Sequence, residues 1–292
     1  MKDASIPGEI TSDEYVLTES FDNDIFYSGI PECSSNSNPT SVKGGKFRLS
    51  IGIPTRNRIE PLFKLLNSLQ KQTLIDFELI ISDDGDKYDL KNEITKAFPG
   101  LEFKYIKGPG FNLPSNKQNI LDNAESNYVL MCGDDHILRE NCVELLYNTI
   151  ISDPNIGIVC ATWPEPYANE IDYQKLKHLE DYYLSLDNVN NSFSFSGYRE
   201  WRNGLKVFAS LHKEQQILES EFAGGSCLMF NKKAVLSSGG FPVNYSRVSF
   251  REDTDISYRI FLRGYRVLIN TAAIAYLVKS AVGEYRDIRE VE

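Results

Sequence analysis

The sequence predicts an α/β protein with a mostly parallel sheet that carries helices on both faces. Short apolar runs rich in β-branched residues alternate along the chain with longer segments whose apolar residues recur at helical spacing. The connections between them are short, as in units where a helix joins two parallel strands. With 292 residues, 41% of them hydrophobic, the chain is long enough for one large or two fused cores.

The alternation begins at residue 48. The apolar run "RLSIGIP" at 48–54 predicts a strand that Pro54 closes. The segment 59–72 predicts an amphipathic helix, because its larger apolar residues fall on one face; they are Ile59, Leu62, Phe63, Leu66 and Leu69. The same reasoning predicts strands at 77–82, 101–106, 128–132 and 156–161, with helices at 87–98, 115–124 and 139–150.

Residues 164–222 interrupt this alternation. The stretch contains ten aromatic residues and no regular pattern, so we expect mostly helix and loop there, inserted into the α/β fold. Regular patterning then returns. It predicts strands at 224–230, 266–269 and 273–278, and helices at 232–237 and 253–263.

The predicted organisation therefore has three parts. Residues 1–46 hold eight acids and three lysines and end in the Ser/Asn/Gly-rich "CSSNSNPTSVKGGK", which is typical of an acidic arm and a linker. Residues 47–163 form the regular α/β subdomain. Residues 164–292 contain the insertion and the later helices and strands.

Composition argues against several classes of protein. Lysine and arginine total 31 against 41 acidic residues, a net charge of −10, which disfavours nucleic-acid binding. The five cysteines include no CxxC pair, so the sequence suggests neither a disulfide framework nor a zinc site. Because no apolar run approaches the ~20 residues of a transmembrane segment and the start lacks the features of a signal peptide, we expect a cytoplasmic protein.

Acidic residues gather where three predicted strands end. The strands lead into "PTRNR" at 54–58, "SDDGD" at 82–86 and "GDDH" at 133–136. In open α/β sheets ligands bind beyond the carboxyl ends of the strands, so the acids at these ends would meet; they are Asp83, Asp84, Asp134 and Asp135. Since clustered carboxylates repel one another, we expect a divalent cation, Mg²⁺ or Mn²⁺, with a nucleotide diphosphate completing its coordination.

These motifs, in this order, resemble those of family 2 glycosyltransferases with the GT-A fold. The first strand is followed by a Pro-Thr-x-Asn segment, the second by "DDGD", and the fourth by "GDDH", which corresponds to the family's DxD motif. A later Glu-Asp pair, Glu252 and Asp253, opens a helix. The resemblance implies a Rossmann-like nucleotide-binding sheet flanked by helices, with an acceptor-side insertion of helices and loops.

The resemblance also implies roles for particular residues. The nucleotide-sugar would be held by the early strand ends and a nearby helix, through Pro54, Thr55, Arg56, Asn57, Asp83, Asp84, Asn119 and Asp134. Asp135, with Asp134, would bind the metal, and Asp84 would face the base. Asp253 would be the catalytic base, and Glu252 beside it would contact the acceptor or position the loop. The candidates for acceptor contacts are Trp201, Tyr198, Gly224 and Gly225.

Two positions depart from the family pattern. His136 stands where many members have a third acid, which leaves open whether its ring contacts metal, sugar or a neighbouring side chain. Gln118 and Asn119 stand where many members have an Arg-Asn pair. Simpler interpretations also exist, because Asp and Gly are common in turns and acids are favoured at helix starts.

Together with this resemblance, the sequence predicts a metal-dependent inverting glycosyltransferase. It would move a sugar from a nucleotide-sugar donor, a UDP-sugar, to a hydroxyl of a saccharide, a lipid-linked glycan or a peptide. One alternative is a catalytically inactive nucleotide-sugar-binding or regulatory protein on the same fold. Another is a sugar-nucleotide pyrophosphorylase, although "PTRNRIE" lacks the glycines that such enzymes carry after the first strand.

Overall fold

The computed structural model of the protein describes residues 47–162, 217–225, 227–246, 249 and 251–276 with their side chains, and residues 199–200, 206–207 and 277 by their backbone. The predicted arm at 1–46 and most of the insertion at 164–222 lie outside the described residues. None of the helices within the described ranges combines the length and apolarity that a membrane span requires.

The first half of the fold alternates strands and helices as predicted. Its elements are β1 (Leu49–Thr55), α2 (Ile59–Leu69), β2 (Phe77–Asp83), α3 (Leu90–Ala97), β3 (Lys104–Lys107), α4 (Leu113–Asn123), β4 (Tyr128–Cys132), β5 (His136–Leu138), α5 (Cys142–Ile151) and β6 (Ile156–Thr162). β4 has its predicted bounds. β5 is missing from the prediction, because a three-residue strand is too short to show a periodicity.

Side-chain caps explain where two helices begin. Asp89 accepts a hydrogen bond from the Asn92 backbone N–H at 3.3 Å, so α3 begins at Leu90 rather than at residue 87. Asn112 accepts one from the Ser115 N–H at 2.9 Å, so α4 begins at Leu113 rather than at residue 115. Both corrections move a helix start to the residue that follows an Asp or Asn cap.

The second half adds short strands and two helices. Its elements are β7 (Arg199–Glu200), β8 (Lys206–Val207), β9 (Ile217–Ser220), β10 (Cys227–Asn231), α7 (Lys232–Ser237), α8 (Glu252–Leu262) and β11 (Arg266–Leu277). The helix at 232–237 has its predicted bounds. β7, β8 and β9 lie inside the stretch predicted as helix and loop, so that prediction is wrong for their residues.

The last strand is also longer than predicted. Two strands were expected at 266–269 and 273–278, whereas β11 is continuous. Its pairing with β6 shifts register between Asn270 and Ile274. This irregularity interrupts the apolar alternation and explains why the sequence suggests two strands.

The sheet has a parallel half and a mixed half. Its described strands follow the order β3-β2-β1-β4-β10-β6-β11-β5, and β9 pairs with β11. β1 is parallel to both β2 and β4, and β2 is parallel to β3. β10 lies between β4 and β6 and is antiparallel to both. The predicted α/β sheet is therefore confirmed, and the ends of β1, β2 and β4 meet at one edge.

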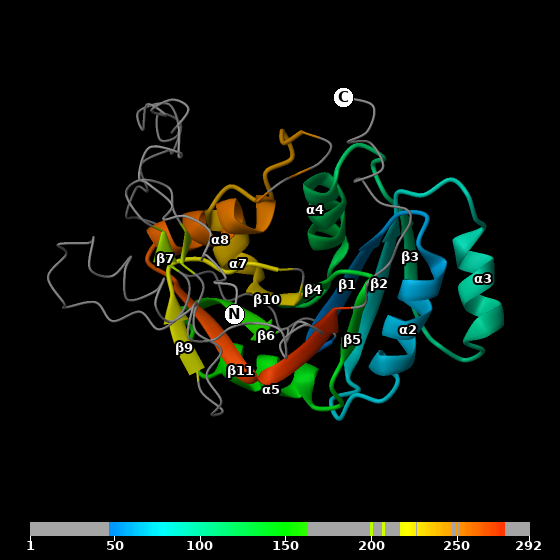
Figure 1. Cartoon of the computed structure of the whole chain (residues 1–292), viewed down its shortest axis with the longest axis horizontal. Helices are drawn as coiled ribbons and strands as arrows, with labels where there is room; N and C mark the ends of the chain where they lie inside the picture. Colours follow the sequence, from blue (N-terminus) through cyan, green and yellow to red (C-terminus); the bar gives the residue numbers. More distant parts are fainter. Residues whose placement is uncertain are drawn as a thin grey trace, which may run out of the picture. The chain divides into compact units, whose positions relative to one another are not determined.

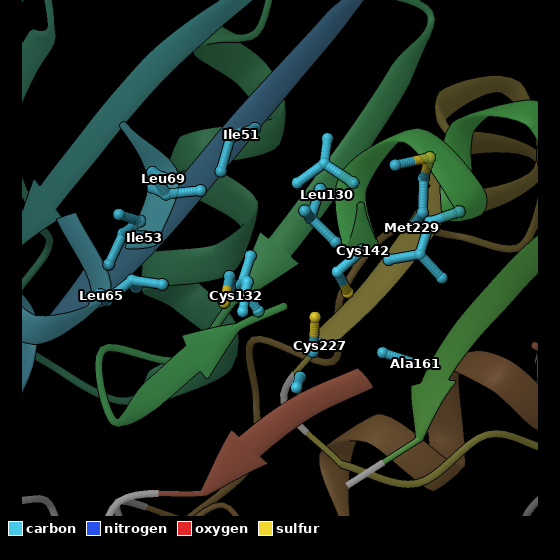
Figure 2. Close-up of a cluster of buried hydrophobic side chains, with 14 of the residues drawn as sticks. Ile51, Ile53, Leu65, Leu69, Leu130, Cys132, Cys142, Ala161, Cys227 and Met229 are labelled. Carbon is cyan, nitrogen blue, oxygen red and sulfur yellow. The ribbon is translucent and has the colours of Figure 1, made fainter. Parts of the chain in front are cut away.

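Two buried clusters fill the two faces of this sheet. On one face, α2, α3 and α5 pack against residues such as Ile51 and Leu130, and Figure 2 shows Leu65 and Leu69 of α2 beside β1. On the other face lie α4, α7 and α8, which Figure 1 shows together on one side of the sheet. Burying each Leu or Ile side chain contributes about 1.5–3 kcal/mol.

Glycines let two helices of the second face approach the strands closely. A Cβ at Gly52 would lie 2.2 Å from Ile120 Cγ2, so glycine is required where α4 crosses β1. A Cβ at Gly157 would lie 2.5 Å from Ile260 Cγ2, so the same holds where α8 crosses β6. The two glycines thereby allow α4 and α8 to pack closely on β1 and β6.

Candidate functional site

Thr55 and Arg58 hold Asp134 from the end of β1. Thr55 Oγ1 donates to Asp134 Oδ2 at 2.7 Å, and Arg58 Nη1 donates to Asp134 Oδ1 at 2.9 Å. Arg58 is the N-cap residue of α2, so the start of that helix places its guanidinium at the end of β4. Asp134 is 4% exposed, and both of its oxygens accept hydrogen bonds from the protein.

Asp135 is the more accessible of the two acids. Its side chain is 15% exposed, against 6% for Asp134. Oδ2 lies 3.3 Å from Arg58 Nη2, and Oδ1 lies 3.1 Å from His136 Nδ1. Burial by itself would raise the pKa of Asp135, but the contacts with His136 and Arg58 together hold this pKa below its ordinary value. Asp135 is therefore ionised at neutral pH.

His136 lies behind Asp135, inside the fold. Its side chain is buried in β5, and Nδ1 also lies 3.3 Å from the Gly133 carbonyl oxygen. Of the roles left open by the sequence, the structure supports contact with a neighbouring side chain.

The acids at the end of β2 are fixed by their own loop, by β3 and by the loop after β3. Asp83 accepts hydrogen bonds from the Gly85 N–H at 2.7 Å and the Tyr105 hydroxyl at 2.8 Å. Asp84 accepts one from the Gly110 N–H at 2.8 Å. A Cβ at Gly108 would lie 2.0 Å from an Asp84 carboxylate oxygen, so this loop closes over Asp84 and requires glycine there.

The turn after β1 is hydrogen-bonded to the loop after β2. Asn57 has a left-handed backbone with φ 57°, and its Oδ1 accepts from the N–H groups of Asp86 and Lys87, each at 3.0 Å. Pro54 is buried within β1, and Arg56 is half-buried in the turn. The predicted segment 54–57 thus lies at the expected edge, with Asn57 organising a neighbouring loop.

Asn119 holds two strand ends together. Its Nδ2 donates to Ser82 Oγ at 3.0 Å and to the Lys107 carbonyl at 3.1 Å. Asn116, one turn earlier on α4, donates to the Ser82 carbonyl at 3.1 Å. Asn119 therefore lies at the predicted edge, and its amide positions the ends of β2 and β3.

Asp253 stands in the first turn of α8 against the segment that precedes β10. Its Oδ2 accepts from the Gly225 N–H at 2.6 Å, and its Oδ1 accepts from the Thr254 N–H at 2.9 Å. A Cβ at Gly224 would lie 3.9 Å from Asp253 Oδ2. The structure therefore brings together three residues that the sequence assigned to the acceptor side.

Asp255 is engaged elsewhere. It binds Arg259 one turn along α8, with contacts of 2.8 Å to Nε and 2.7 Å to Nη2. Arg259 also donates to the carbonyls of Ser238 and Gly240, so this pair ties α8 to the end of α7. Of the two aspartates, Asp253 is the one held by the Gly225 backbone.

Glu252 is paired with Lys117, a residue that sequence reasoning missed. Lys117 Nζ lies 2.5 Å from Glu252 Oε1, and both side chains are buried. The available signal was helical spacing, because Lys117 stands three residues before Ile120 and four before Leu121, which face the core. A lysine on that face requires an acidic partner, but nothing in the sequence indicates which one.

Tyr198 and Trp201 lie outside the residues whose side chains the structure describes. Their assignment to the acceptor remains a prediction.

The four acids from which the sequence predicts a metal site do not together form a metal-binding group in the described part of the chain. Within the described ranges, no group of three or more His, Cys, Asp or Glu side chains is arranged to hold a metal ion. Asp134 is buried and held by Thr55 and Arg58, whereas Asp135, which contacts Arg58 and His136, has an ionised carboxylate that is partly exposed. Mg²⁺ often uses one or two carboxylates with water and phosphate oxygens, so Asp135 fits as a single ligand.

The sequence of this chain matches a known family and is similar to several named proteins. Residues 50–235 match the family described as Glycosyl transferase family 2. The chain is 27% identical over 241 residues to the chondroitin synthase of Pasteurella multocida (strain Pm70), which covers 78% of this chain and 24% of that protein. It is 26% identical over 239 residues to the chondroitin synthase of Escherichia coli, covering 78% and 34%. This chain thus spans about a quarter to a third of these relatives' length.

Solved structures share the fold. The crystal structure of GalNAc-T7 with UDP, GalNAc and Mn²⁺ matches with a TM-score of 0.60 and 14% identity, over 80% of this chain and 44% of that one. The mannosyltransferase PcManGT from Pyrobaculum calidifontis, in complex with GDP-Man and Mn²⁺, matches with a TM-score of 0.56 and 15% identity, over 86% and 63%. Because the family match covers more than half of the chain, this protein belongs to glycosyl transferase family 2, and it has the GT-A fold.

Proposed function

We propose that this protein is a metal-dependent inverting glycosyltransferase that moves a sugar from a UDP-sugar to an acceptor hydroxyl. The observation that carries the proposal is the place of Asp253, which is held by the Gly225 amide in a segment separate from the strand ends of Asp84 and Asp134. An inverting transfer requires this division, because the base and the leaving group act on opposite sides of the anomeric carbon.

On the donor side, the proposal rests on acids that are fixed before any ligand binds. Asp84 is oriented by the Gly110 N–H, which suits a carboxylate that recognises the base of uridine. Thr55 and Arg58 orient Asp134, which we assign to the ribose. Asn57 and Asn119 support this side indirectly, since their amide groups hold the loops that carry the acids.

Asp135 is the residue that would hold Mn²⁺ or Mg²⁺. A bound divalent cation supplies neutralisation of the charge that develops on the diphosphate leaving group. The chain itself contributes Arg58, whose fixed positive charge lies next to both acids and lowers their repulsion of an anionic donor.

Asp253 would remove the proton from the acceptor hydroxyl. Its two oxygens each accept one backbone hydrogen bond, which orients the carboxylate and leaves further lone pairs for the acceptor. As the acceptor oxygen forms its bond to the anomeric carbon, the bond between that carbon and the diphosphate oxygen breaks. The product then has the inverted anomeric configuration.

For the acceptor, we favour a saccharide, because two relatives of this chain are named chondroitin synthases. A lipid-linked glycan and a peptide are the other classes to be tested. Gly224 and Gly225 offer backbone that a sugar can approach closely, next to Asp253. Trp201 and Tyr198 are proposed as aromatic platforms for the acceptor.

The proposal is tested by incubating the whole chain with nucleotide sugars and each acceptor class, with Mn²⁺ or with EDTA. We expect UDP release that requires both an acceptor and the metal, and a product whose anomeric configuration, read by NMR, is inverted. Release that persists in EDTA would remove the metal from the proposal, and a retained configuration would remove the role of Asp253. Nucleotide binding without turnover in every arm would favour a binding protein on the same fold.

A further inference from the structure

A buried lysine of α4 meets the helix that carries the candidate base. The Lys117 and Glu252 side chains are only 5% and 6% exposed, and Nζ lies 2.5 Å from Oε1. α4 packs on β1 and β2, whereas α8 packs on β6 and β11. The ion pair therefore joins the nucleotide side of the sheet to the first turn of α8.

Stability alone does not explain an ion pair at this place. Taking two charges out of water has a cost that their attraction offsets only in part, and apolar side chains of similar volume often stabilise a core as well. Burial raises the pKa of Glu252 against the opposing attraction of Lys117. The second oxygen, Oε2, is buried and accepts no hydrogen bond from the part of the chain that the structure describes.

The start of α8 is held at Asp253 by the Gly225 N–H, but its first residue, Glu252, has Lys117 as its side-chain partner. The helix has no side-chain N-cap, and two non-glycine residues just before it, Ser249 and Arg251, have left-handed backbones with φ 54° and 66°. Such backbones are unfavourable and persist only where their surroundings impose them. The contact of Lys117 with Glu252, the first residue of the helix, supplies an anchor directly after this strained turn.

α4 holds the segment before α8 at two further points. Asn112 Nδ2 donates to the carbonyls of Val243 at 3.1 Å and Tyr245 at 2.7 Å. Gln118 Oε1 accepts from the Phe241 N–H at 2.9 Å. These hydrogen bonds between uncharged groups hold the loop before α8, whereas Lys117 contacts α8 itself. One helix thus supports both sides of the candidate site.

We propose that Lys117 and Glu252 are positioning residues that fix Asp253 relative to the bound donor. The inference rests on the proposed function and gives Glu252 a task other than contact with the acceptor. Because Asp253 follows Glu252 in the same turn, any shift of Glu252 moves the base. A misplacement of about 1 Å can cost ~10²-fold in rate, whereas donor binding at the strand ends would stay unchanged.

The test compares the wild-type chain with Lys117→Met, Glu252→Gln, the double variant, and Glu252→Asp. Each single removal leaves a buried partner group unpaired, so melting temperatures should fall by about 5–15 °C. The double variant should melt close to wild type, because no unpaired charge remains. Lys232→Met is the control, since Lys232 donates to the Ala124 carbonyl from the half-buried surface of α7 and should affect stability alone.

The deciding measurements are kcat and the dissociation constant of UDP with Mn²⁺. We expect the double variant to lose about 10- to 100-fold in kcat with donor affinity within twofold of wild type. Glu252→Asp keeps the charge but withdraws the carboxylate by one methylene, and it should lose kcat similarly. A wild-type kcat in either variant, or a parallel loss of donor affinity, would overturn the inference. If the wild-type chain transfers no sugar, the proposed function fails first, and this inference fails with it.

Discussion

The Arg58 guanidinium lies 2.9 Å from the Asp134 carboxylate, and both side chains are buried. The same guanidinium lies 3.3 Å from Asp135. Arg58, a cation of the chain, therefore already reduces the repulsion between the adjacent acids from which the sequence predicts a metal. A metal at this site is accordingly proposed on the accessibility of Asp135 rather than on the need to neutralise a bare cluster.

Arg58→Met should destabilise the metal-free protein strongly. The change leaves buried Asp134 without its cation, and breaking a buried pair in this way typically costs about 3–5 kcal/mol. Urea unfolding in EDTA measures the loss. Arg48→Met is the matched control, because Arg48 and Asp76 form an exposed pair whose loss should cost less than about 1 kcal/mol. Equal losses of unfolding free energy in the two variants would show that the Arg58 contact stabilises the protein no more than the exposed pair does.

Asp135→Asn should remove a share of stability that depends on pH. The pKa of Asp135 lies below its ordinary value of 3.8, so the folded protein binds this proton less tightly than the unfolded chain. The stabilisation is fully present above pH 3.8 and is lost as pH falls through the lower folded pKa. In unfolding curves measured between pH 7 and pH 3, the difference in unfolding free energy between wild type and variant should therefore begin to shrink as the pH falls below 3.8. A difference that stays constant over this range would contradict the assignment.

Asp253→Asn should lower kcat by about 10²- to 10⁴-fold while UDP and metal affinity stay close to wild type. The substitution keeps the shape of the side chain and removes its basicity. Asp255→Asn is the control, because Asp255 is bound to Arg259 and should affect the junction of α7 and α8 rather than catalysis. Steady-state rates with a fixed acceptor decide the matter, and a larger loss in Asp255→Asn would move the base two residues along the helix.

Asp84→Ala and Gly108→Ala should each weaken the binding of uridine. The first removes the carboxylate assigned to the base, and the second places a methyl group 2.0 Å from it, which forces the loop or the acid to move. Calorimetric titration with uridine, without the diphosphate, isolates this contact. Unchanged affinity in both variants would mean that the acid at the end of β2 does not face the base.

The parts of the fold that repeat a local pattern could be predicted from the sequence. β4 and α7 have their predicted bounds because each combines a compact apolar pattern with clear end signals. The direction of β10 could not be predicted, because alternation along a strand is the same whether its neighbours run parallel or antiparallel. β9 was missed because its four residues show too short a pattern within an irregular stretch.

In the candidate site, too, local patterns predicted some residues and could not predict others. The acids were found because each stands directly after a strand, and strand ends meet at one edge of the sheet. Their partners were not found, because contacts such as Lys117 with Glu252 join residues 135 positions apart in the chain. Distant neighbours of this kind decide which hydrogen bonds a carboxylate accepts. They therefore also decide how well that carboxylate can bind a ligand.

The position of β10 in the sheet, between β4 and β6, also constrains how the protein folds as it is synthesised. β4 and β6 leave the ribosome well before Cys227–Asn231, and the sheet cannot be closed until that segment arrives. During this interval both strands present unpaired edges, which are templates for association with other chains. Completion of the sheet depends on pairing between distant segments, which is slow compared with local folding. A nascent chain that stalls before residue 227 should therefore aggregate readily and depend on chaperones for its solubility.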